Sequence, residues 1–150
     1  MKSHVRHAVS EELALRRADT RDLDRRLRAF LRSDEAYRKY LPTETWLTGG
    51  CWLLAEALWH VLGGDLVAVV SDLNVEHVAL RLGDRIVDGD GFSRPETLLR
   101  RWRVREGVPR PRIVDFEAVR AEVLRRGEIP PPDTRLSGLV RDLWQVLVVR

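Results

Sequence analysis

Residues 48–64 constrain the fold more than any other stretch, because they join a long apolar run to glycine pairs at both ends. The run from Cys51 to Leu62 is apolar on nearly every side, which is typical of a helix buried inside a domain. Gly63 follows the run and provides a helix stop. The pattern therefore predicts a buried helix that begins near Cys51, the only cysteine of the chain.

The position of Cys51 at the start of this helix makes its thiol a candidate nucleophile. Backbone N–H groups in the first turn of a helix lack partners within the helix, and the helix dipole favours negative charge there. A thiolate in that position has a lowered pKa and reacts at neutral pH. Glycine at positions 49 and 50 lets the backbone fold closely around it. The alternative is that Cys51 is a small apolar residue that fills the core.

A second pattern, residues 75–91, predicts a β-hairpin that turns at residues 83–84. With a two-residue loop, Asp90 lies directly across from His77 and Asp88 lies diagonal to it, all on one face of the sheet. A carboxylate beside a histidine orients the ring and stabilises the imidazolium, as a Cys–His pair requires. His77 is thus the candidate base, and both aspartates are candidates for the orienting acid. A one-residue shift of register would reverse the faces.

The order of these motifs resembles the papain-like superfamily of cysteine peptidases. A Gly-Gly-Cys that opens a buried helix is followed by a His-Val-Ala-Leu strand and an Ile-Val-Asp strand. The compact bacterial branches are most similar: transglutaminase-like proteases, NlpC/P60-type peptidases and papain-fold toxins. The resemblance covers roughly residues 48–91. It implies a cysteine hydrolase or acyl transferase acting on amide bonds, with Cys51 as nucleophile, His77 as base and Asp88, rather than Asp90, as orienting acid.

The oxyanion hole departs from the papain pattern. Papain itself uses a glutamine upstream of the cysteine, whereas the only glutamine of this chain is Gln145. The backbone N–H groups of Gly50 and Cys51 are the candidate donors to an oxyanion. Trp46 and Trp52 flank the motif and are the expected walls of a substrate cleft.

The whole pattern predicts one α+β domain, with a small antiparallel sheet packed on the buried helix and further helices flanking it. The chain has 150 residues, enough for a single domain with a hydrophobic core. Its strands are expected at residues 66–70, 75–82 and 85–88. The expected parts are a helical N-terminal extension at residues 1–42, a core at 43–92 and a helical C-terminal part at 93–150.

Outside the motif, helical spacing predicts further elements. A leucine at every fourth position from Leu23 to Leu31 predicts a helix with an arginine-rich outer face. Ser93 is the expected N-cap of a later helix. Residues 110–114 are expected to form an edge strand between prolines, and the helix after it is expected to turn Leu124 inward.

Charge and composition argue against several classes of protein. The chain carries 26 basic and 23 acidic residues, a balance unlike that of a dedicated nucleic-acid binder. It has no run of ~20 apolar residues and no apolar leader at its start. A lone cysteine forms neither an intrachain disulfide nor a Cys-rich zinc site, and a free thiol suits a reducing compartment. We therefore expect a cytoplasmic protein without a membrane segment, metal or other cofactor.

Residues 136–149 form a strongly apolar segment, expected to be helical at first and strand-like at 146–149. Such a segment can dock on its own domain or on a partner. A second possible function is therefore a non-catalytic binding or assembly protein of the same fold. It would hold a protein partner through this segment and the arginine-rich faces, whereas the resemblance implies a protein or peptide substrate.

Overall fold

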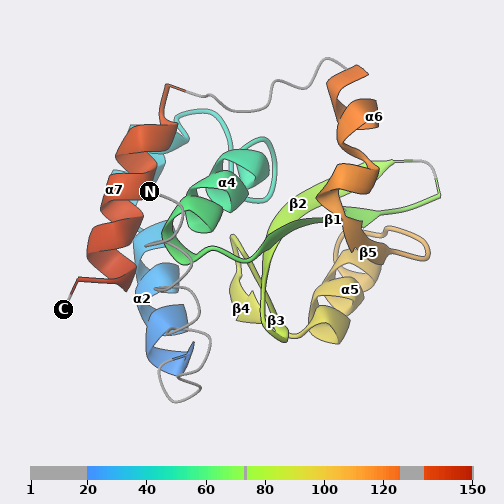
Figure 1. Cartoon of the computed structure of the whole chain (residues 1–150), viewed down its shortest axis with the longest axis horizontal. Coiled ribbons are helices and arrows are strands. Elements are labelled where there is room, and N and C mark those ends of the chain that lie inside the picture. Colours follow the sequence, from blue (N-terminus) through green and yellow to red (C-terminus); the bar gives the residue numbers. More distant parts are fainter. Residues whose placement is uncertain (1–19, 73, 126–133, 150) are drawn as a thin grey trace.

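The computed structural model describes residues 20–72, 74–125 and 134–149, and it confirms an α+β fold. Its antiparallel sheet has five strands in the order β4-β3-β2-β1-β5 (Figure 1). The strands are β1 (Asp65–Val70), β2 (Val75–Leu82), β3 (Arg85–Asp88), β4 (Gly91–Ser93) and β5 (Arg112–Asp115). The three strands expected from the sequence are therefore neighbours in one sheet.

Helices lie on both sides of this sheet. They are α2 (Thr20–Leu31), α3 (Asp34–Tyr40), α4 (Cys51–Leu62), α5 (Pro95–Val104), α6 (Arg120–Arg125) and α7 (Leu136–Leu147). A 3₁₀ helix, η2 (Phe116–Ala118), precedes α6. Figure 1 shows α2, α4 and α7 grouped on one side of the sheet and α5 on the other. Among the described residues, no helix has both the length and the apolar character needed to cross a membrane.

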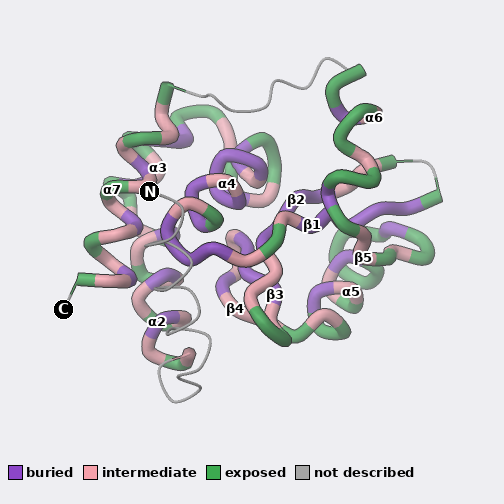
Figure 2. Tube along the Cα trace, in the orientation of Figure 1, coloured by how far each residue is buried: buried purple, intermediate pink, exposed green. Residues whose placement is uncertain are grey.

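The helix that begins at Cys51 is central, as its composition predicts. Most residues of α4 are buried, and Figure 2 shows burial around much of its length. One side of α4 packs on β2 and another on α7. The shared core includes leucines of α2 and α7: Leu23, Leu27, Leu31, Leu139, Leu143 and Leu147. Each fully buried leucine stabilises the fold by ~1.5–3 kcal/mol. Because the leucines of α7 belong to this core, the apolar face of α7 docks on its own domain.

The opposite face of the sheet is covered by α5. Leu98 and Trp102 of this helix pack against alternate residues of three strands: Val67, Val69, Ala79 and Ile86. The intervening residues of β1 and β2, whose side chains point to the other face of the sheet, face α4 instead. Both faces of β1 are therefore covered, which accounts for its uninterrupted apolar sequence.

The hairpin has the two-residue turn that its sequence predicts. Leu82 pairs with Arg85, and Gly83 has a φ of 62°, which favours glycine. Pairing with β3 extends only to Leu80, because β3 ends at Asp88. The half of β2 from residue 75 to 79 therefore has no β3 neighbour and keeps an open edge.

Several details differ from the sequence expectations. The short strand β4 was not foreseen, and Ser93 pairs with Ile86 within it. Arg94 is consequently the N-cap of α5 and Pro95 its first residue. The strand β5 joins the sheet beside β1, so residues 93–150 are not wholly helical.

Two apolar expectations are also wrong. Leu124 is 44% exposed, whereas Phe116 and Val123, which the same pattern also predicts to face inward, are buried. Residues 146–149 do not form a strand: α7 continues to Leu147, which is buried one helical turn beyond Leu143.

Candidate active site

The loop before α4 places Cys51 at the first position of the helix, with Gly50 as N-cap. Gly50 donates its N–H to the Thr45 carbonyl at 3.0 Å. A Cβ at Gly50 would lie 2.6 Å from Leu41 Cδ2, so this close turn requires glycine. Cys51 as a whole residue is partly exposed, and its thiol forms no disulfide.

Of the two tryptophans expected to wall a cleft, Trp46 is instead a core residue. It is 2% exposed, and its indole donates to the Leu31 carbonyl at 2.8 Å. It also packs over Gly89, where a Cβ would lie 2.7 Å from Trp46 Cβ. Trp46 therefore holds the loop before the cysteine against the turn that ends β3. Trp52 is also largely buried, with 9% of its surface exposed, but it is part of the lining of a cavity described below.

His77 is buried in the middle of the fold, with 1% of its surface exposed. Its ring stacks on Trp102 of α5, with centroids 4.8 Å apart and planes inclined by 30°. Its Nε2 atom lies 3.0 Å from Asp88 Oδ2. Because an ionised carboxylate only accepts hydrogen bonds, Nε2 carries the proton in this contact.

Asp88 is the carboxylate that orients His77, and it is itself fixed at both oxygens. Its Oδ1 accepts the backbone N–H of Asp90 at 3.0 Å, and Arg101 Nη2 lies 3.6 Å from Oδ2. Burial raises the pKa of Asp88, but the hydrogen bond and charge of His77, together with Arg101, outweigh burial and hold the pKa below its ordinary value. Asp88 is therefore ionised at neutral pH.

Asp90 does not reach His77, although the simple count along the hairpin places it opposite. Its carboxylate binds Arg101 and Arg105 of α5, the latter at 2.7 Å. The count fails because β3 ends at Asp88 and the chain turns beneath the Trp46 loop. The expectation that one aspartate lies within hydrogen-bond distance of His77 is confirmed for Asp88.

The second ring nitrogen of His77 is the one available to the thiol. Nδ1 is buried, and it neither donates nor accepts a hydrogen bond within the described part of the chain. Cys51 nevertheless interacts with the ring closely enough to change its protonation. Burial lowers the pKa of His77, yet the hydrogen bond to Asp88 and the interaction with Cys51 raise it to about 9.

The thiol is affected in the opposite direction. Burial raises the pKa of Cys51, but the interaction with His77 and the backbone N–H groups of Val78 and Trp52 outweigh it, and the pKa lies below its ordinary value. Val78 belongs to the open edge of β2, where its N–H is not taken by β3. Both shifts favour a thiolate beside an imidazolium.

The backbone around the thiol limits the choice of oxyanion donors. The Gly50 N–H is already bonded to the Thr45 carbonyl, so the expectation that it serves as a donor is wrong. The N–H of Cys51 occupies the first helical position, outside the helix's own hydrogen-bond ladder, and stays a candidate.

Two residues of the site were not found from the sequence. Arg101 and Trp102 contact Asp88 and His77, but within an arginine-rich helix their pattern reads as one exposed and one core residue. No local signal marks them, because both contacts join α5 to strands distant in the sequence.

No three His, Cys, Asp or Glu side chains in the described ranges are grouped so that they could hold a metal ion. Comparisons with models of protein families, with curated protein sequences and with solved structures give no match for this chain. The functional argument consequently depends on the geometry of Cys51, His77 and Asp88.

Proposed function

We propose that this chain is a cysteine hydrolase or acyl transferase that acts on amide bonds of a protein or peptide. The observation that carries the proposal is the buried His77–Asp88 contact together with a Cys51 thiol whose pKa the interaction with His77 lowers. Asp88 binds one ring nitrogen of His77, the other has no hydrogen-bond partner among the described residues, and Cys51 interacts with the same ring. This combination is what covalent catalysis by a thiol requires.

The chemistry follows from the protonation states. The Cys51 thiolate attacks the carbonyl carbon, a C–S bond forms, and negative charge develops on the carbonyl oxygen near the Cys51 N–H. His77 then gives a proton to the departing amine as the C–N bond breaks and a thioester remains. Water, or an acceptor amine, attacks the thioester while His77 removes its proton, and the thiolate is released. Throughout, Asp88 holds the ring in place and stabilises its charged form.

The alternative, a non-catalytic binding protein, would depend mainly on the arginine-rich faces, since the apolar face of α7 is covered by α2 and α4. On α2 those arginines are partly neutralised by ion pairs of Arg25 and Arg26 with Asp22. We therefore favour the catalytic function, in a compartment that keeps the thiol reduced.

The test is acyl-enzyme formation with p-nitrophenyl acetate, followed by intact-mass spectrometry and nitrophenolate release. Wild type is expected to give a burst of nitrophenolate and an acetylated Cys51. The Cys51→Ala variant is expected to give no burst and no acetylated protein. Loss of the thiol is expected to change the free energy of unfolding by no more than about 1 kcal/mol. His77→Ala should slow acylation strongly, whereas His60→Ala, on the same helix as Cys51, is the matched control. Acylation of Cys51 no faster than that of free cysteine would exclude the proposal.

A further inference from the structure

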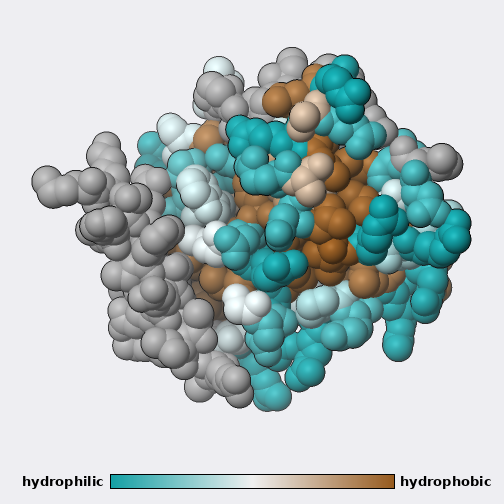
Figure 3. Space-filling view, turned by 45° about the vertical axis from the view of Figure 1, so that its right-hand side comes forward, coloured by the Kyte–Doolittle hydropathy of each residue, from teal (hydrophilic) through white to brown (hydrophobic). Residues whose placement is uncertain are grey.

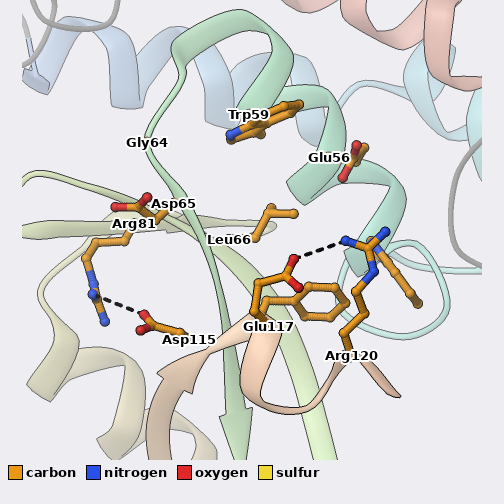
Figure 4. A pocket seen from close by; sticks show the side chains of 11 residues that line it. Glu56, Trp59, Gly64, Asp65, Leu66, Arg81, Asp115, Glu117 and Arg120 are labelled. Carbon is orange, nitrogen blue, oxygen red and sulfur yellow. Dashed lines mark hydrogen bonds and ion pairs between the residues drawn. The ribbon is translucent and has the colours of Figure 1, made fainter. Parts of the chain in front are cut away.

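A cavity of about 730 Å³ lies between α4, the start of β1 and the segment from Asp115 to Arg120, and Trp52, the residue after Cys51, is part of its lining. This volume is within the range of pockets that bind small ligands or single side chains. Figure 4 shows Glu56 and Trp59 of α4 facing Glu117 and Arg120 across it. Figure 3 shows a hydrophobic area on one face of the molecule, bordered by hydrophilic side chains.

The wall formed by α4 combines aromatic rings with a carboxylate. Trp52, Glu56 and Trp59 are spaced by four and three residues, so they share one face of the helix. Trp52 packs edge-on against Phe116 at 5.0 Å on the opposite wall. Trp59 is 37% exposed, and its ring packs edge-on against that of His60, with centroids 5.0 Å apart.

The charge of the cavity is opposite to that of the chain. Four carboxylates and two arginines line it, although the whole chain has a net charge of +3. Both arginines already have carboxylate partners: Arg81 lies 3.7 Å from Asp115, and Arg120 lies 3.0 Å from Glu117. The surplus negative charge therefore comes from Glu56 and Asp65.

Glu56 is the carboxylate best placed for a ligand. It is half-buried, and its one ion-pair partner in the described structure is His60 at 3.7 Å. Burial raises the pKa of Glu56, and the charge of Arg120 offsets this only in part. A cation that entered between Glu56 and the indole rings would relieve that cost of burial, and aromatic faces attract cations further.

We propose that this cavity binds the guanidinium group of an arginine side chain in the polypeptide on which Cys51 acts. This identification of substrate class rests on the proposed function. A planar guanidinium suits both elements of the wall, since it stacks on indole rings and pairs with carboxylates. Trp52 directly follows Cys51 in the sequence. Glu56 lies ~7.5 Å from Cys51 along the helix axis.

The test uses the Cys51→Ala protein, so that binding is measured without catalysis. The ligands are acetyl-Gly-Arg-Gly-amide and its citrulline counterpart, which has nearly the same shape but no charge. Binding is followed through the indole N–H resonances of Trp52 and Trp59, assigned with tryptophan-to-phenylalanine variants. We expect the arginine peptide to shift both resonances and to bind about tenfold more tightly than the citrulline peptide.

Glu56→Gln should abolish most of that tenfold preference, while Glu96→Gln, an exposed glutamate on α5, should leave it unchanged. Equal affinity for both peptides, a preference that survives Glu56→Gln, or no shift of either indole would overturn the proposal. If arginine binds as expected but wild type forms no acyl-enzyme, the cation site stands and the proposed function falls. If wild type forms the acyl-enzyme but the arginine peptide does not bind, the proposed function stands and the cation site falls.

Discussion

Replacing Asp88 by asparagine removes the negative charge beside His77 while keeping the size of the side chain and its ability to accept a hydrogen bond. In the native protein the pKa of His77 is raised to about 9, with Asp88 providing the strongest opposition to burial. Without that charge, only the interaction with Cys51 opposes burial, and we expect the pKa of His77 to fall to about its ordinary 6.5. At about pH 7.5 the imidazolium fraction then falls from nearly all molecules to roughly a tenth or less.

The thiolate–imidazolium pair should decrease in the same proportion. We therefore expect alkylation of Cys51 by iodoacetamide at about pH 7.5 to be roughly tenfold slower in Asp88→Asn than in wild type. The rate is measured by intact mass against time, with circular dichroism to show that the variant is folded. NMR titration of the His77 ring provides the pKa directly.

Asp90→Asn is the matched control, because it removes an equal charge two residues away that binds arginines rather than His77. Its alkylation rate should stay within about twofold of wild type, a difference small compared with the one expected for Asp88. An unchanged rate in Asp88→Asn, or an equal loss in both variants, would refute the assignment of Asp88 as the orienting acid.

Two further predictions concern stability. Because the pKa of Asp88 lies below its ordinary value, its stabilising effect is complete above that value and is lost as the pH falls through the folded-state pKa. The difference in unfolding free energy between wild type and Asp88→Asn should therefore shrink from about pH 6 to about pH 2 in urea titrations; a constant difference would contradict the linkage. Gly50→Ala should lower the unfolding free energy by about 1–3 kcal/mol, since the new methyl meets Leu41 and a backbone carbonyl. Gly138 lies inside α7, where a new methyl would meet only ordinary van der Waals contacts. Gly138→Ala should therefore leave the unfolding free energy unchanged or raise it by up to about 1 kcal/mol. An equal loss of unfolding free energy in both variants would argue against the steric cause.

The sequence was most informative where local chemistry decides the structure. The apolar run from Cys51 and the stop at Gly63 determine α4, and the Gly83 turn determines the hairpin register. From these features, the sequence narrowed the carboxylate partner of His77 to two aspartates, Asp88 and Asp90. Periodicity and turn chemistry act over a few residues, so they transfer well from sequence to structure.

The remaining errors arise where distant segments meet. The choice between Asp88 and Asp90 depends on Trp46, which packs over Gly89 and turns the chain there. Arg101 acquires its role only because α5 crosses the face of the sheet that carries Asp88. No local pattern contains that information, since both contacts join elements far apart in the sequence.

The packing of α4 between β2 and α7 also sets an order of events during synthesis. The helix that carries the thiol is complete at Leu62, but the helix that covers its outer face ends at Leu147. At ~5–20 residues per second, a ribosome needs roughly 4–17 s to make the chain between these two points. During that interval the leucines of α4 have no cover on one side, and the nascent chain presents them to chaperones or to other nascent chains. Completion of α7 thus determines when the outer face of α4, the helix that carries the cysteine, is covered.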